Sequence, residues 1–141
     1  YAEYYVTLRY IRERMEHRVL GDKDFQPQFD DTEAEVLALL IAWTKPSTIY
    51  EFSPCAGYST GILLDSLSLI NNGKGVVKSF DIHNTSMENL GAHPVHNVKW
   101  EFSLGDVREQ FSQWDYNALD FLFIELFGFF LIRWLNQNLK S

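Results

Sequence analysis

Four acidic residues fall at or just after the ends of successive short apolar segments. They are Glu51, Asp81, Asp106 and Glu125. Asp81 follows a turn of small residues at the distance, about 20 residues, at which a carboxylate accepts hydrogen bonds from both hydroxyls of a ribose. A solvent-facing aspartate that opens a loop has the same appearance in sequence. The pattern indicates a ribose-binding acid, with the loop aspartate as its alternative.

The turn that precedes Asp81 is the segment Ser53-Pro54-Cys55-Ala56-Gly57. Its small residues let the chain turn sharply and let the backbone approach a ligand closely. Ser59 and Thr60 follow, where they can cap or line the start of a helix. An ordinary strand-to-helix turn has a similar composition, so composition alone leaves the two interpretations equal.

Two side chains are candidates for proton transfer. His83 lies just after Asp81, and the imidazole group titrates near neutral pH. A loop histidine of this kind is commonly only solvated. Glu125 is the second candidate, but it has no further oxygen ligands beside it, so it does not predict a divalent metal site. Asp106 suits the N-cap of a helix that starts at Val107.

These residues require an alternating set of strands and helices to position them. Strands are expected over 48–52, 76–82, 98–102 and 120–125, and helices over 58–70, 107–114 and 129–139. Such alternation predicts a mostly parallel sheet with right-handed crossovers and helices on both faces. Ligands of such sheets bind at the carboxyl ends of the strands. Two further helices, over about 4–19 and 32–45, are expected first, so a single domain divides into 1–46 and an α/β core over 47–141.

The segment over 51–60 resembles motif I of class I S-adenosylmethionine-dependent methyltransferases. It is similar to the E-x-G-x-G-x-G-[YW]-S-T form found in a small-molecule O-methyltransferase-like branch. The matching residues are Glu51, Gly57, Tyr58, Ser59 and Thr60, whereas Ser53 and Cys55 replace the first two glycines. The resemblance covers about residues 30–139 and implies a Rossmann-like fold that is incomplete in its C-terminal half.

The resemblance also implies which residues hold the cofactor. It assigns the methionyl end to Glu51 and the 53–57 backbone, the ribose to Asp81, and the adenine side to Asp106. The full cofactor-binding set is Glu51, Ser53, Cys55, Ala56, Gly57, Tyr58, Ser59, Asp81 and Asp106.

The implied activity is methyl transfer to an oxygen or nitrogen of a small molecule or sugar. Acceleration would come mainly from holding the two reactants in line, with His83 or Glu125 as a base for the acceptor. A dinucleotide site would need glycines at the positions that Ser53, Cys55 and Tyr58 occupy, so nicotinamide or flavin binding is not expected.

Charge and cysteine content narrow the class of partner. The net charge of -7 and pI near 5.0 disfavour nucleic acid and are compatible with a cationic sulfonium ligand. Cys55 is the single cysteine, which favours a reducing, cytoplasmic setting. The apolar stretch over 118–135 carries Asp120, Glu125 and Arg133, and its uncharged runs fall short of the roughly 20 residues that a membrane span needs.

The expected sheet ends early. A complete fold of this family has more strands, and the fourth strand would present an open edge carrying Phe121 to Ile124. We therefore expect a fragment or truncated product, or a homo-oligomer that covers this edge. The alternative function is a catalytically degenerate domain that acts as a cofactor-binding or interaction module.

Overall fold

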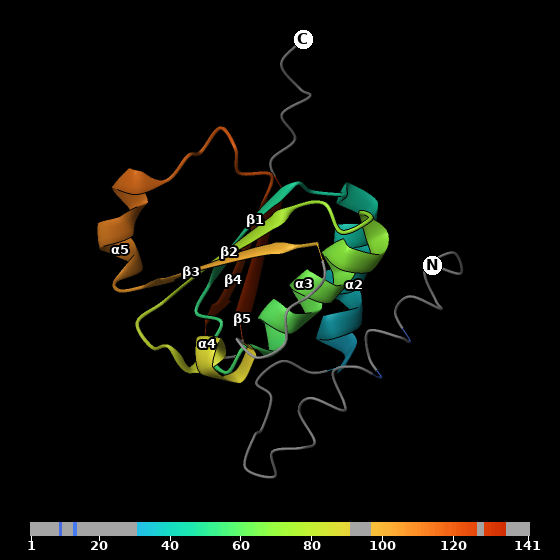
Figure 1. The fold of residues 1–141 in the computed structure, drawn as a ribbon, viewed down its shortest axis with the longest axis horizontal. Coiled ribbons are helices and arrows are strands. Elements are labelled where there is room, and N and C mark those ends of the chain that lie inside the picture. The colour runs from blue at the N-terminus through green and yellow to red at the C-terminus, as the bar shows by residue number, and fades with distance from the viewer. Residues whose placement is uncertain (1–8, 10–12, 14–30, 91–96, 127–128, 135–141) are drawn as a thin grey trace.

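The computed structural model describes residues 9, 13, 31–90, 97–126 and 129–134 (Figure 1). The helix predicted over 4–19 lies outside these residues, except for Arg9 and Glu13, which are helical and form an ion pair of 2.9 Å. The elements are, in order, α2 (Asp31–Thr44), β1 (Thr48–Phe52), α3 (Tyr58–Ile70), β2 (Val76–Asp81), α4 (Thr85–Leu90), β3 (Lys99–Leu104), α5 (Val107–Gln110), the 3-10 turn η2 (Phe111–Gln113), β4 (Phe121–Leu126) and β5 (Phe129–Trp134).

The strands form one five-stranded sheet in the order β3-β2-β1-β4-β5. β1 pairs in parallel with both β2 and β4, and β2 pairs in parallel with β3. The predicted parallel, Rossmann-like sheet is therefore confirmed over its first four strands. Strand order reverses at β1, which is the place where such sheets bind ligands.

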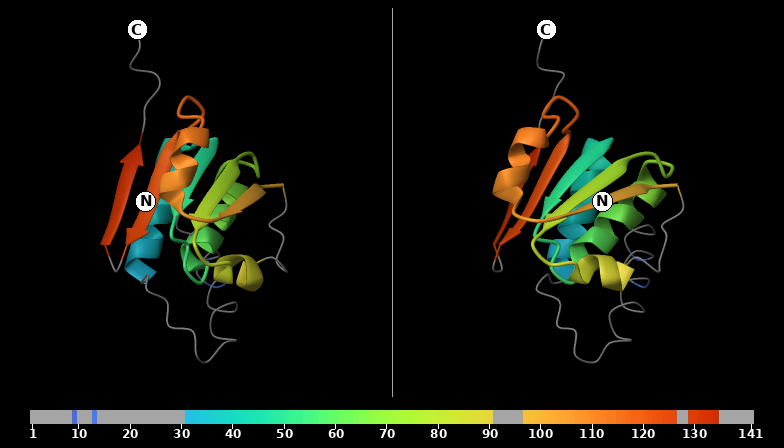
Figure 2. Two further views of the ribbon diagram at one scale, coloured as in Figure 1. Left: turned by 90° about the vertical axis from the view of Figure 1, so that its left-hand side faces the viewer. Right: turned by 60° about the vertical axis from the view of Figure 1, so that its left-hand side comes forward.

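Helices cover both faces of the sheet, as predicted. α2 and α3 lie on one face, and α5 lies on the other (Figure 1; Figure 2). The first face is the larger core, in which Leu37 and Ile41 of α2 and Leu63 of α3 pack against Val77 and Phe123 of the strands. The second core is smaller and aromatic, and it comprises Tyr50, Phe52, Phe80 and Leu119 with Val107, Trp114, Leu122 and Ile124 packed against them.

Asp120 fastens the amino ends of β1 and β4 together. Its Oδ2 accepts hydrogen bonds from the backbone N–H groups of Ser47 (2.9 Å) and Thr48 (3.2 Å). The backbone N–H of Asp120 in turn donates to the carbonyl of Thr48 at 3.2 Å. This cross-link lies at the end of the sheet opposite to the carboxyl edge.

The helix predicted over 129–139 is wrong. Residues Phe129–Trp134 form β5, which pairs antiparallel with β4, while 135–139 lie outside the described residues. The segment is rich in aromatic and branched side chains that favour strands. The unpaired backbone groups along the outer edge of β4 offer hydrogen bonds to any strand beside them. Pairing with that edge therefore overrides the helical pattern.

Two smaller differences concern the loops. Helix α4 lies between the predicted strands, where no element is predicted, and the helix predicted over 107–114 is shortened to α5 followed by η2. The edge of β4, expected to be open, is covered by β5 of the same chain. A homo-oligomer stays a prediction, but the β4 edge is not free to form it. Among the described helices, none has the length and apolarity to cross a membrane.

Candidate functional site

The carboxyl ends of the parallel strands bring the predicted acids into one row. Phe52 at the end of β1 lies opposite Phe80 of β2 and Ile124 of β4, and Asp81 lies opposite Leu104 of β3. Asp81 and Glu125 follow Phe80 and Ile124 directly in the chain. Both acids therefore reach the same edge of the sheet, on either side of the turn that leaves β1.

The turn over 53–57 is held in an unusual backbone conformation. Ser53 (φ 53°), Cys55 (φ 49°) and Gly57 (φ 94°) all have positive φ. Left-handed backbone is unfavourable for residues with a Cβ, which explains why the related motif has glycine at the first two of these positions. Gly57 has a second constraint, because a Cβ placed there would lie 2.8 Å from Cδ1 of Leu90.

Asp81 supports this turn from the neighbouring strand. Its Oδ2 accepts the backbone N–H of Cys55 and its Oδ1 accepts that of His83, each at 3.1 Å. A carboxylate has about four acceptor sites, so each oxygen retains capacity for one more donor. Asp81 is 8% exposed, so it is buried without being completely enclosed.

Glu51, which the resemblance assigns to the methionyl end of the cofactor, lies fully buried next to the start of the turn. Its carboxylate is fully buried and accepts hydrogen bonds from the hydroxyls of Ser59 (2.7 Å), Thr60 (2.7 Å) and Ser79 (2.6 Å). Burial raises the pKa of Glu51, and the negative charge of Asp81 adds to this effect, while the three hydroxyl donors oppose it. Direct contact between Glu51 and a cofactor stays a prediction, and the enclosed geometry favours an indirect role.

Asp106 caps the short helix α5. Its side chain accepts the backbone N–H of Arg108 at 2.9 Å, as its N-cap alternative predicts. The guanidinium of Arg108 also pairs with this carboxylate and, together with the backbone bond, lowers the pKa of Asp106 to about 2. A contact with adenine stays a prediction, and it would have to coexist with the Arg108 pair.

The two candidates for proton transfer are less well defined. The imidazole of His83 is exposed. Glu125 lies in β4 opposite Phe130 of β5, and its side chain is outside the described part of the structure. Among the described residues, no group of acidic, histidine or cysteine side chains could hold a metal ion.

The remaining predicted residues belong to the turn and its helix. Tyr58 is half-buried against the larger core, Ala56 is half-buried, and Cys55 is exposed. Their contact with a cofactor stays a prediction.

Sequence reasoning missed four residues at or beneath this edge. Ser79 and Trp100 belong to the hydrogen-bond group around Glu51, because the indole N–H of Trp100 donates to the Ser79 hydroxyl at 3.0 Å. Strand alternation could have placed Ser79 on the same face as Glu51. Ile82 and Leu104 are exposed aliphatic residues, 64% and 61% exposed, at adjoining strand ends. An aliphatic residue at or just after a predicted strand end, close in sequence to an acid, was the available signal.

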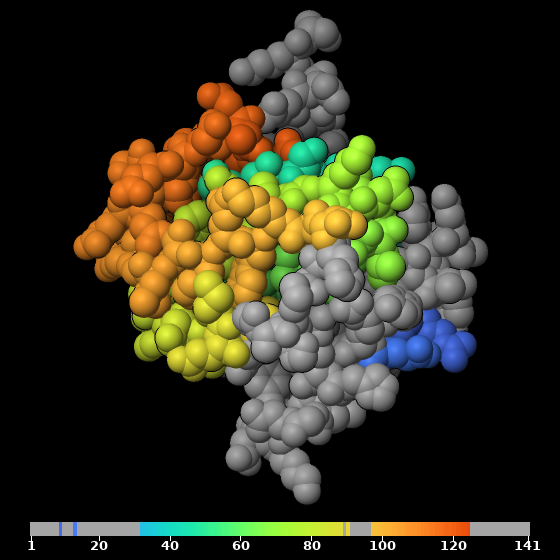
Figure 3. All heavy atoms as spheres, in the orientation of Figure 1, coloured from blue at the N-terminus to red at the C-terminus, as the bar shows by residue number. Residues whose placement is uncertain are grey.

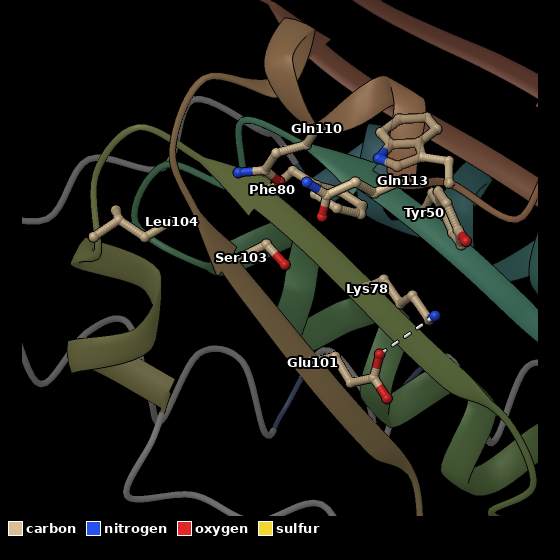
Figure 4. Close-up of a pocket in the computed structure, with 9 residues that line it drawn as sticks. Tyr50, Lys78, Phe80, Glu101, Ser103, Leu104, Gln110 and Gln113 are labelled. Carbon is tan, nitrogen blue, oxygen red and sulfur yellow. Dashed lines mark ion pairs between the residues drawn. The ribbon is translucent and has the colours of Figure 1, made fainter.

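A hollow of about 460 Å³ lies on the second face of the sheet, beneath α5. Figure 4 shows the amides of Gln110 and Gln113 above its floor and the Lys78–Glu101 ion pair at its other end. β3, light orange in Figure 3, runs across the surface beside it. The lining of this hollow includes Leu104 of the carboxyl edge but neither Asp81 nor any residue of the turn over 53–57.

The fold has close counterparts among solved structures. An O-methyltransferase from Bacillus cereus in complex with S-adenosylhomocysteine has a TM-score of 0.55 and 23% identity, over 85% of this chain and 54% of its own. The O-methyltransferase TomG from Streptomyces achromogenes, in complex with S-adenosylmethionine, has a TM-score of 0.56 and 18% identity, over 82% and 52%. A putative O-methyltransferase from Klebsiella pneumoniae has a TM-score of 0.55 and 21% identity, over 85% and 53%.

No family model matches the sequence, and no curated protein matches it. The chain spans about half the length of the solved structures that it resembles. At 18–23% sequence identity, the similarity to these structures shows a shared fold. The chain therefore has the Rossmann-like fold of class I S-adenosylmethionine-dependent O-methyltransferases, over about half of their length.

Proposed function

We propose that this chain binds S-adenosylmethionine at the carboxyl ends of β1, β2 and β3. The observation that carries the proposal is the Asp81 carboxylate, which holds the turn over 53–57 through Cys55 and keeps acceptor capacity for a ribose. The structural neighbours that contain S-adenosylhomocysteine and S-adenosylmethionine support the same cofactor.

The residues around Asp81 fit the rest of such a ligand. Ile82 and Leu104 offer apolar surface beside the acid, as a nucleoside base next to its ribose requires. The positive φ values at Ser53, Cys55 and Gly57 turn the backbone tightly around the end of β1. The net charge of -7 favours a cationic ligand.

We further propose that the complete protein transfers the methyl group to an oxygen or nitrogen of a small molecule or sugar. The bound cofactor supplies an electrophilic methyl group on a sulfonium. The chain holds the donor in line with the acceptor, which is the main source of acceleration in such a displacement. His83, which follows β2, or Glu125, which lies near the end of β4, would accept the acceptor's proton. We propose a cytoplasmic location and neither a metal nor a nucleic-acid partner.

One observation favours a second function. Ser53 and Cys55 have positive φ at two positions where the related motif has glycine, so the turn departs from the cofactor-binding pattern. The alternative is a catalytically degenerate domain that binds cofactor or a protein partner without turnover.

Calorimetric titration with S-adenosylhomocysteine tests the cofactor proposal. We expect micromolar binding to the parent chain, no binding of NAD, and binding at least about tenfold weaker in Asp81→Asn, because hydrogen bonds to a charged group contribute about 1.5–3 kcal/mol. Asp115→Asn is the matched control, since Asp115 is an exposed aspartate in the turn before β4. If a folded parent chain does not bind the ligand, the cofactor proposal is refuted.

A further inference from the structure

A directed chain of hydrogen bonds runs across three strands beneath the turn over 53–57. The indole N–H of Trp100 in β3 donates to the hydroxyl of Ser79 in β2 at 3.0 Å, and this hydroxyl donates to Oε2 of Glu51 in β1 at 2.6 Å. An indole N–H can only donate, whereas a hydroxyl both donates and accepts. Trp100 therefore occupies an acceptor site of Ser79 and leaves its proton to point toward Glu51.

The Glu51 carboxylate connects this hydrogen-bond chain to the helix that follows the turn over 53–57. Oε1 accepts from Ser59 and Oε2 accepts from Thr60, each at 2.7 Å. Ser59 and Thr60 form the first turn of α3, whereas Glu51 lies one residue before the end of β1. The carboxylate thus joins the two ends of the segment that contains the turn, and it fixes how far apart they are.

The carboxylate and the three hydroxyls that it accepts are shielded from bulk water. Glu51, Thr60 and Ser79 are 0% exposed and Ser59 is 1% exposed, so a lost hydrogen bond leaves a buried polar group unsatisfied. Burial already raises the pKa of Glu51, and the Ser79 hydroxyl is the strongest of the groups that oppose this rise. Loss of that hydroxyl would favour a protonated Glu51, whose new O–H would compete with Ser59 and Thr60.

We propose that Ser79 and Trp100 are positioning residues for cofactor binding, which act through Glu51 to preset the turn over 53–57. This inference rests on the proposed function for its effect on affinity. It goes beyond that function because neither residue reaches the carboxyl edge: Ser79 lies two residues before Asp81, and Trp100 lies in the first half of β3. Neither residue needs to touch the cofactor.

The test measures S-adenosylhomocysteine affinity and unfolding free energy in Ser79→Ala and Trp100→Phe. We expect the dissociation constant to rise about tenfold in Ser79→Ala and about threefold in Trp100→Phe, as expected from losing hydrogen bonds to a charged and to a neutral group. Ser66→Ala is the matched control, because the Ser66 hydroxyl is equally buried and has no hydrogen-bond partner in the described structure. A Ser79→Ala effect no larger than that of Ser66→Ala would overturn the inference.

A double-mutant cycle with Glu51→Gln separates positioning from general destabilisation. If Ser79 acts through Glu51, Ser79→Ala should change affinity less than about twofold in the Glu51→Gln background. Independent, additive effects of the two substitutions would contradict the proposal. Compared with the parent chain, Ser79→Ala should lose additional affinity as the pH falls, because Glu51 takes up a proton in the variant.

Amide hydrogen exchange keeps this inference distinct from the cofactor proposal. The backbone N–H groups of Cys55, Gly57 and Gly61 are hydrogen-bonded within or beside the turn, to Asp81, Pro54 and Gly57 respectively. Ser79→Ala should speed their exchange and Ser66→Ala should not. If the parent does not bind the ligand but this difference persists, the cofactor proposal fails and the positioning of the turn stands. Unchanged exchange would refute the positioning itself.

Discussion

Ser53 and Cys55 adopt left-handed backbone at φ 53° and 49°, although each carries a Cβ. This conformation costs roughly 1–2 kcal/mol per residue relative to the right-handed region. Glycine removes that cost but loses about 0.5–1 kcal/mol more backbone freedom on folding. The difference predicts that each glycine substitution stabilises the chain by about 0.5–1 kcal/mol. The backbone hydrogen bonds from Ser53 to Phe80 and from Cys55 to Asp81 are unaffected by the change.

The double variant Ser53→Gly/Cys55→Gly should therefore gain about 1–2 kcal/mol, if the two effects add. Urea unfolding measures this gain as a shift of the midpoint by about 0.5–1 M at an unchanged slope. Asn72→Gly is the control, because Asn72 has a similar φ of 52° and asparagine tolerates this region. An unchanged or lowered midpoint in the double variant, with a neutral control, would show that the turn is not strained at these positions.

Three further predictions concern other parts of the chain. Gly57→Ala should destabilise the chain by about 2–4 kcal/mol in thermal unfolding, because the added methyl combines left-handed strain with a clash against Leu90; a shift no larger than that of a surface Gly→Ala change would count against it. The pKa of Asp106, lowered to about 2, means that this carboxylate stabilises the fold above its unfolded pKa and ceases to do so as the pH falls from about 4 to 2. In Asp106→Asn, the unfolding free energy should fall less steeply over this pH range than it does in the parent chain. An equally steep fall in both proteins would refute the Arg108 pair. Sedimentation at rising concentration should show self-association through the outer edge of β5, and a monomer at every concentration would exclude it.

The sequence was sufficient to predict the parallel core. Short segments rich in aromatic and branched residues, bounded by turn residues, located β1 to β4 to within about two residues. The turn over 53–57 and Asp81 were placed at the same edge because the carboxyl ends of parallel strands must meet there.

Other features depend on tertiary contacts that no local pattern encodes. The partners of Glu51 come from α3 and β2, and its burial is evident only once the helix is packed on the sheet. β5 was predicted as a helix because Phe129–Trp134 is apolar without strict alternation, and the adjoining edge of β4 decided the outcome. The ion pair between Arg108 and Asp106 is local instead, since the two residues are two positions apart, and it depends on the side-chain conformation at the start of α5.

The Asp120 cross-link has a consequence for the opposite end of the sheet. By joining the starts of β1 and β4, it fixes which residue of β1 lies beside which residue of its neighbours. A slip of one residue in β1 would exchange the two faces, moving the Glu51 carboxylate among the aromatic rings around Trp114 and bringing the Tyr50 ring against the three hydroxyls. One residue is the smallest register shift that a strand can make, and it already moves every side chain of β1 to the other face. Asp120 thus keeps Glu51 on the face of the sheet that carries its three hydroxyl donors, although Asp120 itself lies at the opposite end of the sheet.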